Sequence, residues 1–303
     1  MSLFLETFSP GKEERPTFIM KKALGIIFFS LAFSAALSAE VQPWPHSTAS
    51  LSIRLYGGLN FLSGGELNKA AEGYGTEWAD LFEGGGYTVS GKFAPAHLGM
   101  NFGGEFIFQF SPNMAVGLGA EYIQSSKSSA LGFSPALPPL VEVSWEPEFS
   151  AIPIAATFYF FLPSGGSLKF FLNAGLGYYL AKAGFNHNWW FIVPIHWEAK
   201  TTGGGLGFHG GVGLELGLSP LVGIIAEVKG RYASFSNFEG SVHWSFPGYP
   251  GTDYTVDGNL WAFDSDGKTF VWLDSVEPAG DDPRQAKVDF SGFSFLAGII
   301  IHF

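Results

Sequence analysis

Residues 290–303 read FSGFSFLAGIIIHF, and their hydrophobic side chains alternate with a period of two. Phe293 and Phe295 fall on one side of this pattern, and Ser294 and Leu296 fall on the other. The alternation predicts a β-strand, because successive side chains of a strand point to opposite faces of a sheet. Chain ends usually fray in soluble domains. A strand that runs to the last residue is expected where it closes a barrel in lipid, because no sheet edge can stay unpaired there.

Residues 20–39 have the three-part pattern of an export signal: Met-Lys-Lys, an apolar run over residues 23–36, and the small-residue site Leu-Ser-Ala. A helix needs about 20 apolar residues to span a bilayer, so this run is too short for an anchor. We therefore predict a cleaved signal peptide with Glu40 as the first mature residue.

Residues 1–19 are predicted to be an upstream leader of uncertain status. They contain three glutamates and do not resemble a signal's basic start, so Met1 and Met20 both remain candidate start sites. Residues 40–303 are predicted to form one outer-membrane β-barrel domain, on the strand pattern described next.

Composition excludes several classes of function. The chain has no cysteine, which removes disulfides and thiolate metal sites, and its net charge of −11 argues against a nucleic-acid partner. Beyond the signal there is no apolar stretch of about 18 residues, so a helical membrane protein is excluded. The seven histidines show no metal-binding spacing, and no catalytic residue, cofactor-binding residue or metal ligand is predicted.

The rest of the chain reads as an all-β fold. Short connections follow the second, fourth and sixth predicted strands, and long ones follow the others; this is the pattern of an antiparallel up-and-down barrel with short periplasmic turns and long extracellular loops. A soluble lipocalin-like barrel shares that topology but could not expose so many Phe, Leu and Ile side chains to water. The alternative is a ten-stranded barrel in which the hairpin at residues 260–272 is inserted. The eight predicted strands are 50–61, 98–110, 114–124, 149–162, 168–181, 205–218, 222–232 and 290–303.

Segments such as IPIAATFYFFLP (residues 152–163) and FFLNAGLGYYL (residues 170–180) resemble strands of the eight-stranded bacterial outer-membrane barrels of the OmpA, OmpX and OmpW type. Gly298, Ile301 and Phe303 match the carboxy-terminal assembly signal of such proteins, although Leu296 stands where a polar residue is usual. The resemblance implies localisation in the outer membrane of a Gram-negative cell envelope. It also implies contact with lipid and lipopolysaccharide and assembly through the terminal strand. We expect a monomer, and no appended peptidoglycan-binding domain, because nothing follows Phe303.

The predicted inward face carries charges of both signs. Eight strands enclose only enough space for side chains, so these charges should pair across the lumen and leave no aqueous pore. The sequence therefore predicts a filled barrel with a structural or surface-interaction role. The predicted lumen charge network consists of Arg54, Glu105, Glu121, Lys169, Glu215, Glu227, Lys229 and Arg231.

Tryptophans in the predicted loops suggest an alternative function. Trp189, Trp190 and Trp197 lie in NWWFIVPIHW and could form a mouth for a small hydrophobic ligand, as proposed for OmpW-like channels. The other interpretation places the loop tryptophans in an interfacial girdle.

An enzyme that modifies outer-membrane lipids is the least favoured function, because the chain lacks the His-x-Ser pair of lipid A deacylases. Two apparent motifs are set aside. The GxGxxG pattern at residues 205–210 is interpreted as lumen packing, and Asp264-Ser265-Asp266-Gly267 as a hairpin turn.

Overall fold

The computed structural model describes residues 50–134, 141–163, 166–190, 194–246 and 253–303, all within one compact unit, Pro43–Phe303. The predicted signal peptide and the upstream leader lie outside the described residues. Among the described residues, no helix is long and apolar enough to cross a membrane.

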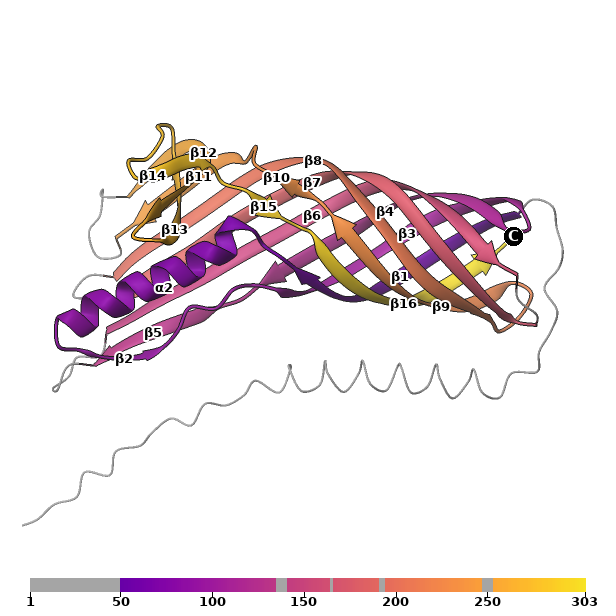
Figure 1. Cartoon of the computed structure of the whole chain (residues 1–303), viewed down its shortest axis with the longest axis horizontal. Coiled ribbons are helices and arrows are strands. Elements are labelled where there is room, and N and C mark those ends of the chain that lie inside the picture. The colour runs from indigo at the N-terminus through magenta and orange to yellow at the C-terminus, as the bar shows by residue number, and fades with distance from the viewer. Residues whose placement is uncertain (1–49, 135–140, 164–165, 191–193, 247–252) are drawn as a thin grey trace, which may run out of the picture. The chain divides into compact units, whose positions relative to one another are not determined.

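Eight antiparallel strands form a closed ring (Figure 1), as the sequence predicts. The last strand pairs with β9 on one side and with β1 on the other, and this second pairing completes the ring. In order around the ring, the strands are β1 (Ser50–Leu62), β3 (Leu98–Ser111), β4 (Met114–Ser126), β6 (Val141–Leu162), β7 (Leu168–Trp190), β8 (Pro194–Gly217), β9 (Val222–Tyr232) and β16 (Gly292–His302).

The two faces of the ring differ in polarity as predicted. Outward side chains are apolar and exposed, for example Phe102 at 60% and Leu206 at 73%, whereas inward Arg54 is only 1% exposed. Water would not tolerate so large an apolar surface, but bilayer hydrocarbon would. The exposed apolar band therefore marks the membrane-spanning part of the barrel.

Glycine allows the closing strands to approach each other. A Cβ on Gly298 would lie 2.1 Å from the Leu55 carbonyl oxygen, and one on Gly58 would lie 1.9 Å from that of Phe295. Beyond this close contact, the Phe303 amide donates to the Leu51 carbonyl at 2.8 Å. The glycine of the predicted assembly signal thus lies at a close approach of the first and last strands.

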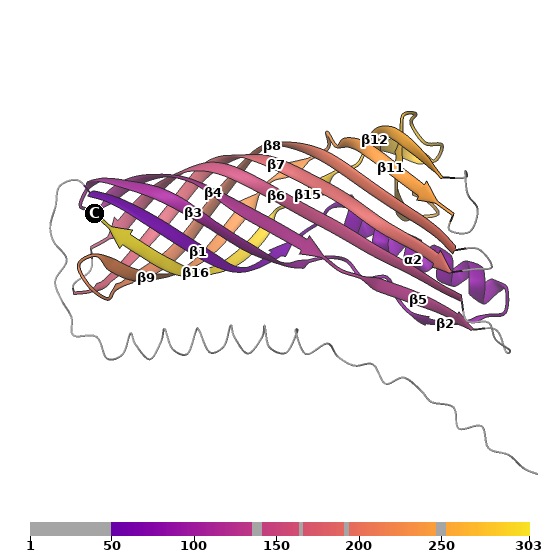
Figure 2. The ribbon, with the colours of Figure 1, turned by 180° about the vertical axis from the view of Figure 1, so that it is seen from behind.

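Three strands run far beyond the apolar band. β6, β7 and β8 contain 22, 23 and 24 residues, whereas a tilted strand needs about 9–11 to cross a bilayer. The strands predicted from the sequence cover the membrane portions of β6, β7 and β8 but not their outer halves. Together with the long connections, these outer halves form what we call the extension, at the end opposite the C-terminus (Figures 1 and 2).

The extension continues the sheet past the ring. Its strands lie in the order β13-β12-β11-β8-β7-β6-β5-β2, so the hairpin formed by β12 and β13 lies outside the barrel ring and the ten-stranded alternative is wrong. Its further elements are α2 (Glu66–Gly84), β2 (Thr88–Gly91), β5 (Ser129–Ser134), β10 (Ser234–Phe235), β11 (Glu239–Ser245), β12 (Tyr254–Ser265), β13 (Lys268–Asp274), β14 (Asp281–Gln285) and β15 (Val288–Asp289).

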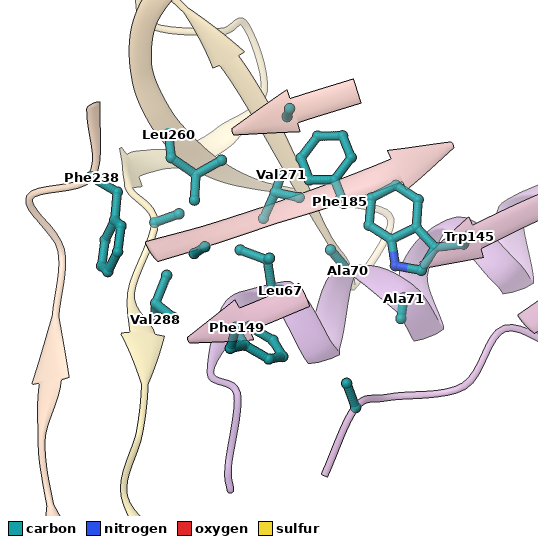
Figure 3. Close-up of a cluster of buried hydrophobic side chains, with 14 of the residues drawn as sticks. Leu67, Ala70, Ala71, Trp145, Phe149, Phe185, Phe238, Leu260, Val271 and Val288 are labelled. Carbon is teal, nitrogen blue, oxygen red and sulfur yellow. The ribbon is translucent and has the colours of Figure 1, made fainter. Parts of the chain in front are cut away.

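The extension has a hydrophobic core of its own (Figure 3). Side chains from the inner faces of β6 and β7, among them Trp145, Phe149 and Phe185, meet Leu67 of α2 and Leu260 of β12. All five are less than 2% exposed. Burial of this many apolar groups is the dominant favourable term for folding the extension.

Helix α2, which the sequence reading did not predict, fills the concave inner side of the extension. Gly73 brings it against β13, where a Cβ would lie 2.2 Å from the Thr269 carbonyl oxygen, and the Tyr74 hydroxyl donates to the Val271 carbonyl at 2.7 Å. Ion pairs join both ends of the helix to the β12–β14 region: Glu66 with Arg284 at 2.6 Å, and Glu77 and Asp80 with Lys268 at 2.9 and 2.8 Å.

Replacing Gly73 by Ala should loosen α2 from β13. Overpacking against a backbone atom costs about 1–3 kcal/mol, which outweighs the gain of up to about 1 kcal/mol from removing a helix glycine. Limited proteolysis should show faster cleavage within the extension, while the barrel keeps its heat-dependent electrophoretic shift. Gly84→Ala is the matched control, because nothing lies within 4 Å of its Cβ position. Equal protease resistance in both variants would contradict this packing role.

Candidate functional site

The lumen contains two hydrogen-bonded charge clusters. The first, which we call the Arg54 cluster, joins Arg54 to Glu227 by a direct ion pair and to Glu105 at 3.8 Å. The Tyr159 hydroxyl accepts from Arg54 at 2.9 Å and donates to Glu105. Asn173 donates to Glu227 at 2.9 Å. Both carboxylates and the guanidinium are thus bound within a space closed to solvent.

The second, the Glu121 cluster, places one carboxylate between two cations. Glu121 accepts from Arg231 at 2.7 Å, from Lys229 at 3.3 Å and from Asn101 at 2.5 Å. Tyr56 lies between the two clusters, since the Lys229 ammonium and the Arg54 guanidinium both lie over its ring at 4.9 and 4.8 Å. One continuous network of polar and aromatic groups therefore crosses the lumen.

A further layer lies toward the short-turn end. His302 of the terminal strand bonds to Glu215 at 2.9 Å and to Ser52 at 2.8 Å, and Lys169 is paired in register with Glu215. Apolar side chains pack beside this group. They are Ile107, Ala115, Phe171, Ile225 and Ile300.

Inward-facing glycines make space for these large side chains. A Cβ on Gly117 would lie 2.2 Å from Glu105, and one on Gly211 would lie 2.7 Å from Glu227. A cavity beside Glu121 and His209 measures about 20 Å³, which is room for about one water.

Each predicted lumen charge lies on the inward face. Seven of the eight are less than 10% exposed: Arg54, Glu105, Glu121, Glu215, Glu227, Lys229 and Arg231. Lys169 is half-buried at the rim. Alternation alone showed that these residues share a face. Their partners depend on barrel stagger: Arg54 and Glu227, for example, are 173 positions apart in the sequence and lie on strands that are not neighbours.

Above the lumen, an imidazole is enclosed by aromatic rings. His187 is 1% exposed, and neither ring nitrogen has a hydrogen-bond partner among the described residues. Burial lowers the pKa of this imidazole to about 3, so the ring is neutral at pH 7. The six rings whose centroids lie within 6.2 Å of it belong to Tyr74, Trp78, Phe93, Trp145, Trp189 and Trp197.

Two of the three predicted ligand tryptophans pack in or against this core. Trp197 is 3% exposed and stacks on Trp244 at 4.6 Å, and Trp189 meets Trp78 edge-on at 4.6 Å. The Trp190 side chain lies outside the described residues. This packing differs from the expected open mouth and from an interfacial girdle, because α2 and the β12–β13 hairpin cover the rings that the sequence placed on a loop.

The GxGxxG pattern and the Asp264-Ser265-Asp266-Gly267 segment lie in a strand and in a hairpin turn. Residues 205–210 lie inside β8, where the strand exchanges β11 for β9 as a partner, and no helix follows them. Asp266 and Gly267, with φ of 50° and 74°, form the two-residue turn between β12 and β13. Among the described residues, no three His, Asp or Glu side chains gather as a metal site.

A closed eight-stranded ring with an apolar exterior defines an integral β-barrel of the outer-membrane type. No family model and no curated protein matches the chain. Solved structures with similarity to it include the outer membrane protein OprG from Pseudomonas aeruginosa, at 10% identity and a TM-score of 0.32, covering 85% of this chain and 97% of that one. Another is the outer membrane protease OmpT from Escherichia coli, at 10% identity and a TM-score of 0.28, covering 88% and 100%. These distant likenesses carry no information on ligand or activity.

Replacing Glu121 by Leu should destabilise the folded barrel strongly. The change leaves two buried cations without their carboxylate, which costs about 3–5 kcal/mol. Glu198→Leu removes one partner of an exposed pair with Lys200 and should cost at most about 1 kcal/mol. Urea unfolding in lipid vesicles, followed by the heat-dependent electrophoretic shift, compares the two variants. Similar midpoints would contradict the proposed contribution of the Glu121 cluster.

Acidification should weaken the extension through His187. The unfolded imidazole takes up a proton below its ordinary pKa of 6.5, whereas the folded one does not until about pH 3. Stability contributed by the neutral ring is therefore complete above pH 6.5 and falls by up to about 1.4 kcal/mol per unit as pH drops toward 3.

The measurement is urea unfolding of the extension, followed by tryptophan fluorescence at pH 7.5 and 5.0. His187→Phe should reduce the difference between the two pH values, whereas His243→Phe, at a partly exposed site, should leave it unchanged. An unchanged pH difference in the His187 variant would exclude this residue as its origin.

Proposed function

We propose that this chain is a monomeric integral protein of the bacterial outer membrane, exported with a cleaved signal peptide, whose closed barrel presents the extension at the cell surface. Its role is structural or one of surface interaction, and it is not an enzyme. The barrel anchors and orients the extension, and the carboxy-terminal strand, with Gly298, Ile301 and Phe303, is the segment that the assembly machinery reads.

The observation that supports this proposal best is the continuous filling of the barrel. The aromatic core around His187 occupies the extension, the Arg54 and Glu121 clusters occupy the middle of the lumen, and the layer around Glu215 occupies the short-turn end. A hydrated ion would have to displace side chains in all three layers. Separating a buried ion pair leaves two charges without their partners, so spontaneous opening is rare.

A narrow channel for small hydrophobic compounds is the alternative. It would need an apolar opening among Trp189, Trp190 and Trp197. Trp189 and Trp197 instead pack against other rings of the core, and the large groove on the extension is polar and lies on the opposite face of the sheet. No observation among the described residues favours this alternative, or a lipid-modifying enzyme, over a closed barrel.

Planar-bilayer recordings test the proposal. The purified protein should give rare small openings and no stable ohmic steps, because three filled layers lie in series. A variant with both Arg54→Ala and Glu227→Ala removes the central ion pair without changing the net charge, and it should also remain closed because the aromatic core lies above it. A wide porin reconstituted in the same bilayers is the positive control.

Large, stable steps from the wild-type protein would overturn the closed-barrel proposal. A second assay measures entry of an apolar dye into vesicles that contain the protein. If the protein speeds entry, and Trp189→Ala with Trp197→Ala abolishes that effect while the electrophoretic shift persists, the hydrophobic channel replaces the closed barrel.

A further inference from the structure

A groove of about 990 Å³ lies on the outward face of the extension. Five adjacent strands, β6, β7, β8, β11 and β12, form its floor. The inner side of the same sheet carries buried core residues such as Phe185 and Ala199. Phe185 and Ala199 also border the groove, so the thickness of the sheet alone separates it from the aromatic core.

Strand register arranges the groove in polar rows that cross all five strands. Counting away from the barrel, the first row is Ser150, Lys182, Thr202, Glu239 and Asn259, and the second is Glu148, Gly184, Lys200, Ser241 and Asp257. No large apolar side chain interrupts either row. Gly184, between Glu148 and Lys200 in the second row, leaves backbone as the floor of the groove.

The first row directly continues the lipid-facing surface. One outward position closer to the barrel, Ile152 on β6 and Leu180 on β7 are 42% and 51% exposed. A strand rises about 3.3 Å per residue, so Lys182 lies roughly 7 Å along β7 from Leu180. The outward face therefore changes from apolar to polar within one side-chain step, at the level where lipid head groups begin.

The charges select among head groups. Lys182 is exposed and has no ion-pair partner among the described residues, and Lys200 is 74% exposed in its pair with Glu198. With Glu148, Glu198, Glu239 and Asp257, the groove holds two cations and four carboxylates, a net charge of −2. A net charge of −2 disfavours any anionic head group unless a divalent cation bridges it, and a simple phospholipid offers no sugar hydroxyls to the four carboxylates. A phosphorylated saccharide fits it, because lysines bind phosphate, carboxylates bind sugar hydroxyls, and divalent cations bridge carboxylate to phosphate.

We propose that the groove binds the phosphorylated saccharide head of an outer-leaflet glycolipid, whose acyl chains lie against the adjacent apolar band. Lys182 contacts a phosphate at the membrane boundary, and Lys200, one row further out on the neighbouring strand, contacts a second. This inference rests on the proposed outer-membrane location and deepens it, because it assigns a lipid-contact site that fixes how deep the barrel sits.

Native mass spectrometry of the detergent-solubilised full chain, in Mg²⁺-containing buffer, tests this site with diphosphoryl lipid A as the probe. Wild-type protein should bind it, and the double variant Lys182→Gln with Lys200→Gln should bind at least tenfold more weakly. The matched control changes Lys92 and Lys127 to Gln, two exposed lysines outside the groove, and should stay within twofold of wild type. Monophosphoryl lipid A should bind at an intermediate level, since one of two phosphates is missing, and cardiolipin should bind weakly and equally to all three proteins.

Equal lipid A binding by the groove variant and wild type would overturn the assignment, as would cardiolipin binding that matches lipid A and shows the same lysine dependence. The electrophoretic shift confirms that each variant is folded before it is tested. Bilayer recordings on the same proteins keep the two proposals apart: a conducting wild type with lysine-dependent lipid A binding would reject the closed barrel and retain the groove.

Discussion

The requirement that every backbone polar group in lipid find a partner governs this molecule. A strand edge left open in hydrocarbon exposes a row of unpaired amides and carbonyls, each costing several kcal/mol. Pairing of β16 with β1 removes that edge, and close approach at Gly58 and Gly298 allows it. The terminal strand must therefore be regular to its last residues, and its outer face must be apolar.

Closure with eight strands then determines the interior. A ring of this size is only wide enough for side chains, so whatever faces inward must pack and, where charged, must pair. Arg54, Glu105 and Glu227 share one set of hydrogen bonds, and glycines such as Gly117 provide the volume that these long side chains need. Inward glycine is thus a packing feature. In β8 it makes room for aromatic rings, since a Cβ on Gly205 would lie 2.9 Å from Phe235 and one on Gly207 would lie 2.7 Å from Tyr179.

Where strands extend beyond the membrane, their two faces need other surroundings. Beyond the ring, β6, β7 and β8 keep their alternation, but lipid no longer covers one face and the lumen no longer encloses the other. The inner face is covered by α2 and the β11–β14 region, which together build an aromatic core around His187. The outer face becomes polar at once, from Leu180 to Lys182 on β7. The same alternation of side chains thus places suitable residues against lipid, against the protein core and in water at successive levels of these strands.

The sequence by itself determined the strand faces, the eight-stranded ring and the set of inward charges, because a period of two is a local property that each segment carries independently of its neighbours. The sequence also contains a helical pattern in the segment that forms α2. Leu67, Ala70, Ala71, Tyr74 and Trp78 recur at helical spacing, although two glycines within that segment weaken the pattern. The tertiary structure alone decided which lumen charges meet, because stagger between non-neighbouring strands sets those distances. It also decided that Trp189 and Trp197 are core residues, because burial depends on segments such as α2 that lie more than a hundred residues away in the chain.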